Sequence, residues 1–361
     1  MKLFNSLSLL AVGVGACGII AVTAPGCSGG DSGSSSSGGT AATGKTPPSS
    51  PAGATATTET GKKTFAVNQL FLGETNRSNA PTKDAWKDYG YNIDGLATTK
   101  ESKDVCTRQG GADSAKQEDG NGGIDNAFGR TVLGFILGLV PTPSKTLNDS
   151  IQGGSFTILF EIAGLTDDPK QTNTGLGGRL LVGGAFGEGK KPTFATTDDW
   201  PYRANPIVPI NGAYINNGTF VNGSGGATVE LALFIQGVQL SLTINRAAIT
   251  FDHTAPNDIT NGTISGVIGT EALVSGIEKV AGRISTQLCG GSTLDTIKQT
   301  IRQASDILQD GTNRAGANCD AISIGLGFTG KRIGDPKTVA VDAVPPPDPC
   351  STPADGGTDG G

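Results

Sequence analysis

The sequence predicts a mainly β protein, with a β-sandwich or jelly-roll-like body and two or three inserted α-helices. Glycine contributes 56 of the 361 residues and aromatic side chains only 5%, a composition that favours turns and strands over a helical bundle. Several segments alternate apolar and polar residues, as strands with one buried face do. Strand-like segments also lie on both sides of a helical segment, which favours packed layers of both kinds.

Short segments separated by Gly, Asn, Asp and Pro have the composition of strands. In the clearest of them, 238–251, Leu240, Leu242 and Ile244 alternate with polar residues. The Asn-Asn-Gly sequence at 216–218 predicts a hairpin turn, because Asn and Gly tolerate a positive φ. The predicted strands are 65–72, 155–163, 179–186, 207–215, 219–222, 227–236, 238–251, 259–268 and 321–333.

Two helices are expected between the last two of these strands, as an insertion near 270–309. Apolar residues at a spacing of three to four over 273–284 predict the first. A similar stripe over 294–308, preceded by the capping residue Ser292, predicts the second. Segment 125–139 is more apolar and is interrupted by glycine, and it is the third helix candidate.

The start of the chain has the order of a bacterial lipoprotein leader. Lys2 gives a positive start, an apolar run follows, and Cys27 opens a stretch of Ser, Gly, Thr, Ala and Pro. We therefore expect 1–26 to be a signal peptide and Cys27 to be acylated. Cys17 is the alternative, because residues 14–16 fit the lipobox pattern better, although cleavage there leaves an apolar start. An ordinary signal peptide and an uncleaved anchor are further alternatives.

Composition divides the rest of the chain into three parts. Residues 27–63 are poor in apolar side chains and rich in Ser, Gly, Thr and Pro, which predicts a disordered tether. Residues 64–343 form the predicted β-rich domain, and 344–361 form a Pro- and Gly-rich tail. The formal net charge is −6 and Lys and Arg do not cluster, which argues against nucleic acid as a partner and against electrostatic docking on anionic lipid.

Four cysteines remain after the leader, and in an exported protein an even number predicts structural disulfides. Three pairings are open. Cys289 and Cys319 bracket one helical segment, so we expect them to pair, with Cys106–Cys350 as the second bridge.

Two Gly-rich segments near Cys106, at 89–95 and 118–129, hold oxygen-bearing side chains of the kind that calcium prefers. The spacing does not match an EF-hand loop, and Asx-type turns are the alternative interpretation. No other cofactor is indicated. The candidate calcium ligands are Asn92, Asp94, Asp119, Asn121 and Asp125.

Two aromatic groups lie near carboxylates, an arrangement that sugar-binding sites use to stack on a ring and bind its hydroxyls. The alternative is that these rings cover the ends of the sandwich. No pair of carboxylates is singled out for glycosidase chemistry, and the only histidine, His253, is expected to be a turn or surface residue. The candidate stacking residues are Trp86, Tyr89, Tyr91, Trp200 and Tyr202.

The leader, the Cys27-Ser-Gly-Gly start, WKDYGYNIDG at 86–95, Cys106 and DGNGGIDNAFG at 119–129 together resemble predicted envelope lipoproteins of myxobacteria-like Gram-negative bacteria. The resemblance implies an outer-envelope address and no particular substrate. We therefore expect an exported, lipid-anchored protein of the outer membrane that is a non-enzymatic binding or structural module. The alternative is an extracellular polysaccharide hydrolase that uses carboxylates. Expected partners are the membrane, through the lipid, and a polysaccharide or another envelope protein.

Overall fold

The computed structural model describes residues 44–112, 117–139, 141–187, 189–222, 227–235, 238–340 and 347–351. The predicted signal peptide, the acylation site Cys27 and the first part of the predicted tether lie outside these residues. Among the described residues, no helix is both long and apolar enough to cross a membrane.

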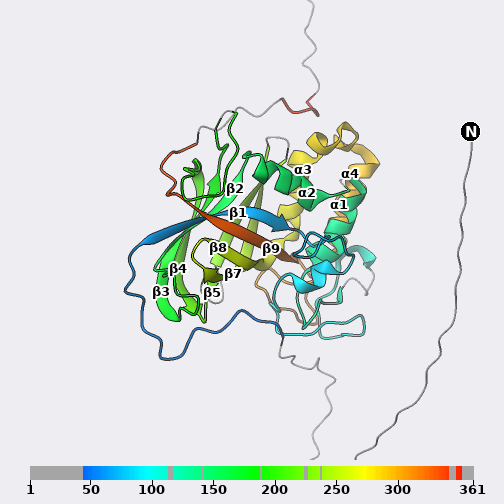
Figure 1. Ribbon diagram of the computed structural model, residues 1–361. Helices are drawn as coiled ribbons and strands as arrows, with labels where there is room; N and C mark the ends of the chain where they lie inside the picture. The colour runs from blue at the N-terminus through cyan, green and yellow to red at the C-terminus, as the bar shows by residue number, and fades with distance from the viewer. Residues whose placement is uncertain are drawn as a thin grey trace, which may run out of the picture. The chain divides into compact units, whose positions relative to one another are not determined.

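Eight antiparallel strands close into a barrel in the order β5-β4-β3-β2-β1-β9-β8-β7, and β7 returns to β5 (Figure 1). A ninth strand, β6 (Ala227–Ile235), pairs with β7 outside the barrel. The barrel strands are β1 (Lys62–Phe71), β2 (Thr157–Ala163), β3 (Asn173–Gly183), β4 (Tyr202–Asn216), β5 (Thr219–Val221), β7 (Val238–Ala255), β8 (Asp258–Gly269) and β9 (Ala321–Ile333).

The predicted sandwich or jelly roll is therefore wrong, although the mainly β composition is as expected. The three-residue strand β5 pairs with two neighbours, because Phe220 lies opposite Ile215 of β4 and opposite Phe251 of β7. This double pairing closes the sheet on itself. Alternation along a strand reports only that one face is buried, which is equally true of a sandwich and of a barrel.

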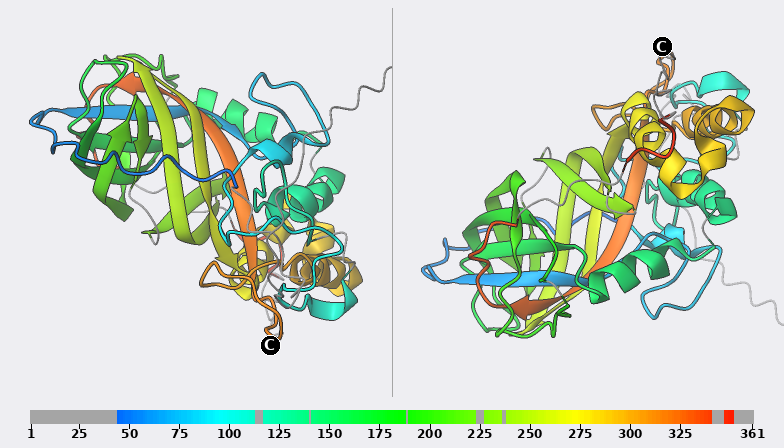
Figure 2. Two further views of the ribbon diagram at one scale, coloured as in Figure 1. Left: turned by 90° about the horizontal axis from the view of Figure 1, so that it is seen from below. Right: turned by 90° about the horizontal axis from the view of Figure 1, so that it is seen from above.

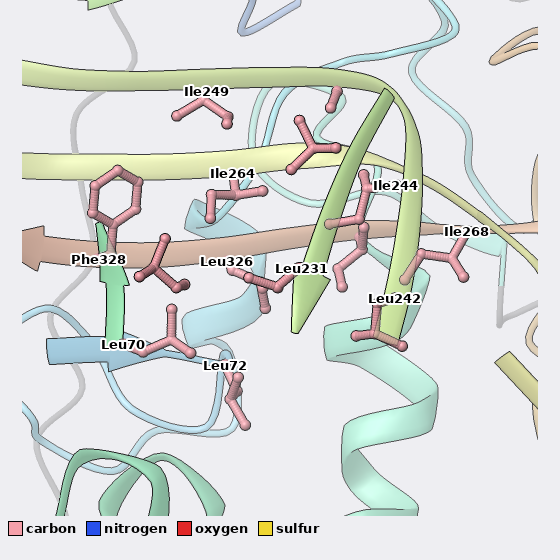
Figure 3. Packing of buried hydrophobic residues seen from close by; sticks show 14 of the residues in the cluster. Leu70, Leu72, Leu231, Leu242, Ile244, Ile249, Ile264, Ile268, Leu326 and Phe328 are labelled. Atoms are coloured by element: carbon pink, nitrogen blue, oxygen red, sulfur yellow. The ribbon is translucent and has the colours of Figure 1, made fainter. Parts of the chain in front are cut away.

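Side chains fill the barrel, so its interior is a packed core. Phe160 stacks on Phe328 with ring centroids 5.1 Å apart, and Phe220 stacks on Phe251 at 4.5 Å. Aliphatic residues of β1, β7, β8 and β9 continue this core toward the helices, as Figure 3 shows for Leu70.

Two long connections meet at one end of the barrel, which we call the helical end (Figure 2). The β1–β2 connection and the β8–β9 connection both start where β9 begins, because β1 and β8 each run antiparallel to β9. The first contains η1 (Ala85–Asp88), η2 (Gln109–Gly111), η4 (Phe128–Val132), α1 (Leu133–Leu139) and α2 (Pro143–Gln152). The second contains α3 (Thr270–Ile284), η5 (Thr286–Leu288) and α4 (Gly291–Gln303).

The helices α3 and α4 confirm the predicted insertion between the last two strands. In the third predicted segment, 125–139, a π-helical turn (η4) precedes the short helix α1. The helix α2 was not predicted.

All four cysteines of the body form disulfides, but the predicted pairing is wrong. Cys106 bonds to Cys319 and Cys289 to Cys350. A parallel bridge between Thr107 and the residue before Cys319 aligns the first pair. This alignment joins segments more than 200 residues apart, which spacing in the sequence does not reveal.

Candidate ligand-binding groove

The helix α2 completes the hydrogen bonding of an open strand edge. β2 pairs with β1 only as far as Ala66, so the later part of β1 has no strand on that side. Ser144, Asn148 and Gln152 are spaced by four residues and therefore share one face of α2. They bond to the backbone of β1 residues 68 and 70 and of residue 72, at distances of 2.7 to 3.0 Å. Covering the edge in this way also blocks its pairing with another chain.

Glu74 fixes the start of the same helix. One carboxylate oxygen accepts the backbone N–H of Ser144 at 2.6 Å, and the other accepts the Ser144 hydroxyl at 2.7 Å. A negative charge at a helix N-terminus is favourable because of the helix dipole, and Pro143 suits the first helical position. Both oxygens of Glu74 are therefore committed to α2.

A groove of about 1120 Å³ lies between the end of β1, the following loop and the helices α1 and α2. Trp86, Leu133 and Leu137 form much of its apolar lining. The volume is slightly above the range of about 300–1,000 Å³ that is usual for small-molecule sites, and the walls are both apolar and polar. Polar residues also line it, among them Asn68, Gln69, Asn79, Lys83, Arg130 and Lys145.

Trp86 is held tightly at the inner side of the groove and is only 7% exposed. The Arg130 guanidinium lies 5.2 Å from its ring centroid and the Lys87 amine 5.7 Å. Gly73 and Gly129 pack closely against its Cβ, where any larger residue would press on it. Trp86 therefore shapes the groove, and much of its ring already has protein partners.

Some polar side chains of the groove remain available to a ligand, Gln69 and Lys83 among them. Within the described part of the chain, neither Gln69 nor Lys83 forms a side-chain hydrogen bond or ion pair, and Lys83 is exposed. An amide and a cation beside an apolar lining are groups that orient a polar ligand.

The predicted calcium ligands organise their own loops. Asp125 accepts the backbone N–H groups of Ile93 at 2.6 Å and Asp94 at 3.2 Å, and Asp119 accepts that of Thr98 at 2.5 Å. The side chains of Asn92 and Asp94 accept backbone N–H groups two or three residues ahead. Asn121 instead donates to Asp88. Only the contacts of Asn92 and Asp94 are the Asx-type contacts of the alternative interpretation, because Asp119, Asn121 and Asp125 bond to residues more than 20 positions away.

Three of these carboxyl groups nevertheless lie close together. Burial raises the pKa of Asp119 to about 9, and nearby Asp94 adds to the rise. Burial also raises the pKa of Asp125 well above its usual range, with contributions from Asp94 and Asp119. Among the described residues, no group of three or more acidic, histidine or cysteine side chains is arranged to hold a metal ion.

The predicted stacking residues are mostly interior, and only Trp86 lines the groove. Tyr89 packs on the outward face of β9 at Gly325 and Gly327, where a side chain on either glycine would collide with it. Tyr91 is buried, and its hydroxyl is 2.6 Å from that of Thr250 on β7.

The second aromatic group lies on another part of the outer wall. Trp200 is fully buried against Leu159 and Leu181, and its indole N–H donates to Gly184. Tyr202 is half-buried beside the Arg179 guanidinium. These rings cover the barrel wall, much as the alternative interpretation expects for the ends of a sandwich.

The groove brings together no free pair of carboxylates among its described residues. Glu74 caps α2, and Asp149 forms an exposed ion pair with Lys145 at 2.6 Å. Elsewhere, Glu161 is paired with Lys62 and Arg179. These carboxylates therefore already have protein partners.

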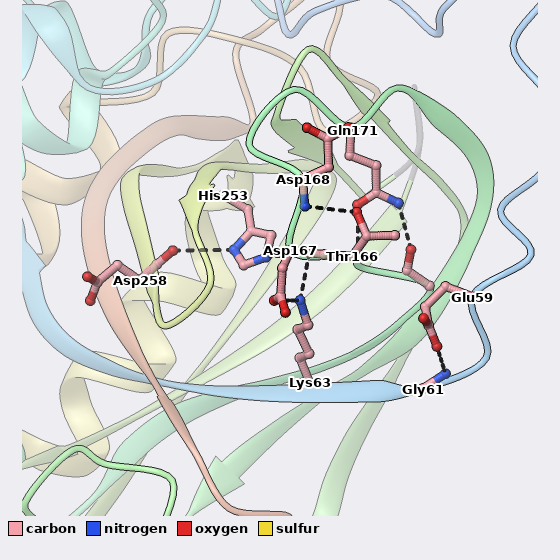
Figure 4. Close-up of polar contacts among 10 residues, drawn as sticks. Glu59, Gly61, Lys63, Thr166, Asp167, Asp168, Gln171, His253 and Asp258 are labelled. Carbon is pink, nitrogen blue, oxygen red and sulfur yellow. Dashed lines mark hydrogen bonds and ion pairs between the residues drawn. The ribbon is translucent and has the colours of Figure 1, made fainter.

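His253 is buried, 1% exposed, at the barrel end opposite the helices, and the expectation of a turn or surface residue is therefore wrong (Figure 4). Its ring nitrogens face the backbone oxygens of Thr166 at 3.1 Å and Asp258 at 3.4 Å. Burial lowers the pKa of His253, and the nearby Lys63 amine lowers it further. Lys63 itself bonds to Asp167 at 2.6 Å. A neutral His253 has a single N–H group, which it can donate to one of these two carbonyl oxygens and so hold the loop.

Sequence reasoning missed the groove, because α2 was not predicted. The available signal was the spacing of Ser144, Asn148 and Gln152 after Pro143.

Comparison with known proteins gives no match to a family model, to a curated protein or to a solved structure.

Proposed function

We propose that this protein is an exported envelope module, anchored through lipid on Cys27 in the outer membrane, that binds a ligand in the groove without catalysis. The groove of about 1120 Å³, with its apolar lining and the available polar groups of Gln69 and Lys83, is the observation that carries the proposal. Export is supported by the two disulfides, which persist in oxidising compartments. The anchor and the resemblance to envelope lipoproteins rest on the sequence.

The carboxylates favour binding over hydrolysis. A glycosidase needs one carboxyl group to donate a proton and a second to act as base or nucleophile. In the groove, Glu74 is committed to Ser144, and Asp149 is exposed and paired with Lys145. The hydrolase alternative therefore receives no support from this geometry. A polysaccharide remains the ligand class that we favour. The amide and hydroxyl side chains that line the groove can form hydrogen bonds with the hydroxyl groups of a sugar.

A substitution on α1 tests the groove. Gly134 lines it, and a Cβ built there meets no other atom, so Gly134→Trp should fill the groove without disturbing the fold. Thr146 on α2 is exposed and does not line the groove, so Thr146→Trp is the control.

The assay is binding to an array of bacterial surface polysaccharides. We expect Gly134→Trp to weaken binding at least tenfold and Thr146→Trp to leave it unchanged. Equal binding by both variants contradicts the groove as the site. Release of reducing ends from a bound polysaccharide would replace the binding proposal with the hydrolase. Mass spectrometry of the native N-terminus tests acylation of Cys27 separately.

A further inference from the structure

Residues 44–61, which we call the strap, run in an extended conformation beside the barrel (Figure 2). The sequence predicted disorder as far as residue 63, yet the strap is hydrogen-bonded along its length and β1 begins at Lys62. Near β1, Thr57 donates its backbone N–H to Thr174 at 2.8 Å and its hydroxyl to Gly164 at 3.1 Å.

Two further contacts hold the middle of the strap. The Tyr214 hydroxyl donates to the carbonyl oxygen of Pro48 at 2.6 Å. The Asn216 amide donates to that of Ser49 at 3.1 Å. Both side chains lie near the end of β4, so the strap is hydrogen-bonded directly to the barrel wall.

The first described residues of the strap are fixed most firmly. Lys45 donates its backbone N–H to Gly122 at 2.9 Å and accepts from the backbone of Asn92 at 2.8 Å. Its amine donates to the carbonyl oxygen of Asp88 at 2.9 Å. Gly44 lies against the Asn92 side chain so closely that a Cβ there would collide with it. The strap thus ends on the loops that follow η1.

This path changes where the chain leaves the body. Without the strap, it would leave from Lys62, at the barrel end opposite the helices, where β1 pairs with the last residue of β2. With the strap in place it leaves from Gly44, beside the loops that contain Asp88 and, two residues earlier, the groove residue Trp86. The strap therefore moves the point of departure to the groove side of the molecule.

The strap also shortens the tether to the acylation site. About 17 residues separate Cys27 from Gly44, whereas about 35 separate it from Lys62. A Gly/Ser-rich chain of about 17 residues has a root-mean-square span of about 23 Å, against about 33 Å for the longer one. A body of this size has a radius of gyration of about 19 Å. Because the shorter span is close to this radius, the departure side is expected to face the bilayer.

We infer that the strap orients the protein on the membrane, with the loops around Lys45, Asn92 and Gly122 as the surface that faces the lipid. This inference rests on the proposed acylation of Cys27. It places the groove beside the bilayer and the β2–β3 loop away from it. The partner is the bilayer surface itself, reached by tethering and not by charge attraction.

Energy transfer to labelled lipid measures this orientation. The full-length acylated protein is reconstituted in phosphatidylethanolamine–phosphatidylglycerol vesicles that contain rhodamine-labelled lipid. A fluorescent amino acid is placed either at exposed Asn121, beside the departure point, or at exposed Lys170, in the β2–β3 loop. We expect transfer from position 121 to be at least twice that from position 170. Equal transfer, or more from position 170, overturns the inference while the anchor stands.

Proline substitutions test whether the strap causes this orientation on the membrane. Lys45→Pro with Thr57→Pro removes the two backbone N–H groups that bond to Gly122 and Thr174. Ser50→Pro is the control, because the Ser50 N–H forms no hydrogen bond with a described residue. The double variant should reduce the twofold difference and the control should keep it. An unchanged difference in the double variant overturns the role of the strap, and failure of the unlabelled protein to carry lipid overturns the anchor and the inference together.

Discussion

Asp119 and Asp125 accept hydrogen bonds from the loop backbone, and Asp125 is buried while Asp119 is half-buried. Burial raises the pKa of Asp119 to about 9, compared with about 3.9 for an unfolded chain. The folded protein therefore holds a proton that the unfolded chain loses at neutral pH. The stability contributed by this group is full below about pH 4 and falls as the pH rises toward 9. The loop keeps its hydrogen bond at neutral pH, because an oxygen of the neutral Asp119 carboxyl group still accepts the Thr98 N–H.

Asp119→Asn should make stability less dependent on pH. The amide stays neutral and its oxygen can still accept the Thr98 N–H, so we expect the variant to melt about 2–4 °C above wild type at pH 8 and close to it at pH 4. Differential scanning calorimetry across this range is the measurement. Asp335→Asn, at an exposed position, is the control. A variant that melts lower than wild type at pH 8 would show that Asp119 is ionised in the folded protein.

Calcium should leave the melting temperature unchanged. One oxygen of each of Asp94, Asp119 and Asp125 accepts a backbone N–H group. Burial raises the pKa of all three carboxyl groups, and a protonated carboxyl group is a poor calcium ligand. We expect the same melting temperature, within about 1 °C, in millimolar calcium and in EDTA. A rise with calcium that Asp119→Asn removes would instead establish the calcium site predicted from the sequence.

At the scale of elements, α2 acts as a substitute strand. Its side chains bond to β1 where β2 no longer does, so the helix and the sheet edge depend on each other. The groove exists because α2 lies on this edge and α1 precedes it. Loss of the α2 contacts should therefore affect stability and ligand binding together.

Asn148→Leu tests this dependence. Leucine has a similar size but leaves both the N–H and the C=O of Leu70 without their partner, so we expect a loss of about 2–4 kcal/mol in the free energy of unfolding. Thr146→Leu, on the exposed side of the same helix, should change it by less than about 0.5 kcal/mol. Urea denaturation compares the two. Similar losses in both variants would mean that α2 contributes only general packing.

The two disulfides differ in exposure and should differ in reactivity. Cys106 and Cys319 are buried, whereas Cys289 and Cys350 are exposed. Thiol–disulfide exchange requires access to sulfur, so mild reduction of the native protein should open Cys289–Cys350 first. Alkylation followed by peptide mass spectrometry identifies the free thiols. Early labelling of Cys106 would show that the barrel end opens more readily than this structure indicates.

At the scale of the whole molecule, local pattern predicted most strands but not their closure. The alternation of Leu240, Leu242 and Ile244 identifies β7, because each of these side chains faces the core. The pairing of Phe220 with Phe251 depends on residues about 30 positions apart, and no local signal specifies it. The candidate site has the same origin, since its walls come from a strand edge and a helix that meet only in the folded chain.

The glycines of β9 have a consequence for the dynamics of the whole fold. Gly325 and Gly327 let Tyr89 and its backbone lie directly on the barrel exterior, while Leu326 and Phe328 point inward. This stretch of wall is thus shielded from water on both sides, unlike a barrel wall that faces solvent. Its amide protons should be the last to exchange with deuterium, at a rate set by global unfolding, and exchange mass spectrometry can check this. The part of the molecule that unfolds last is then the contact between β9 and the loop that contains Tyr89. This contact joins the barrel to the loops that line the groove.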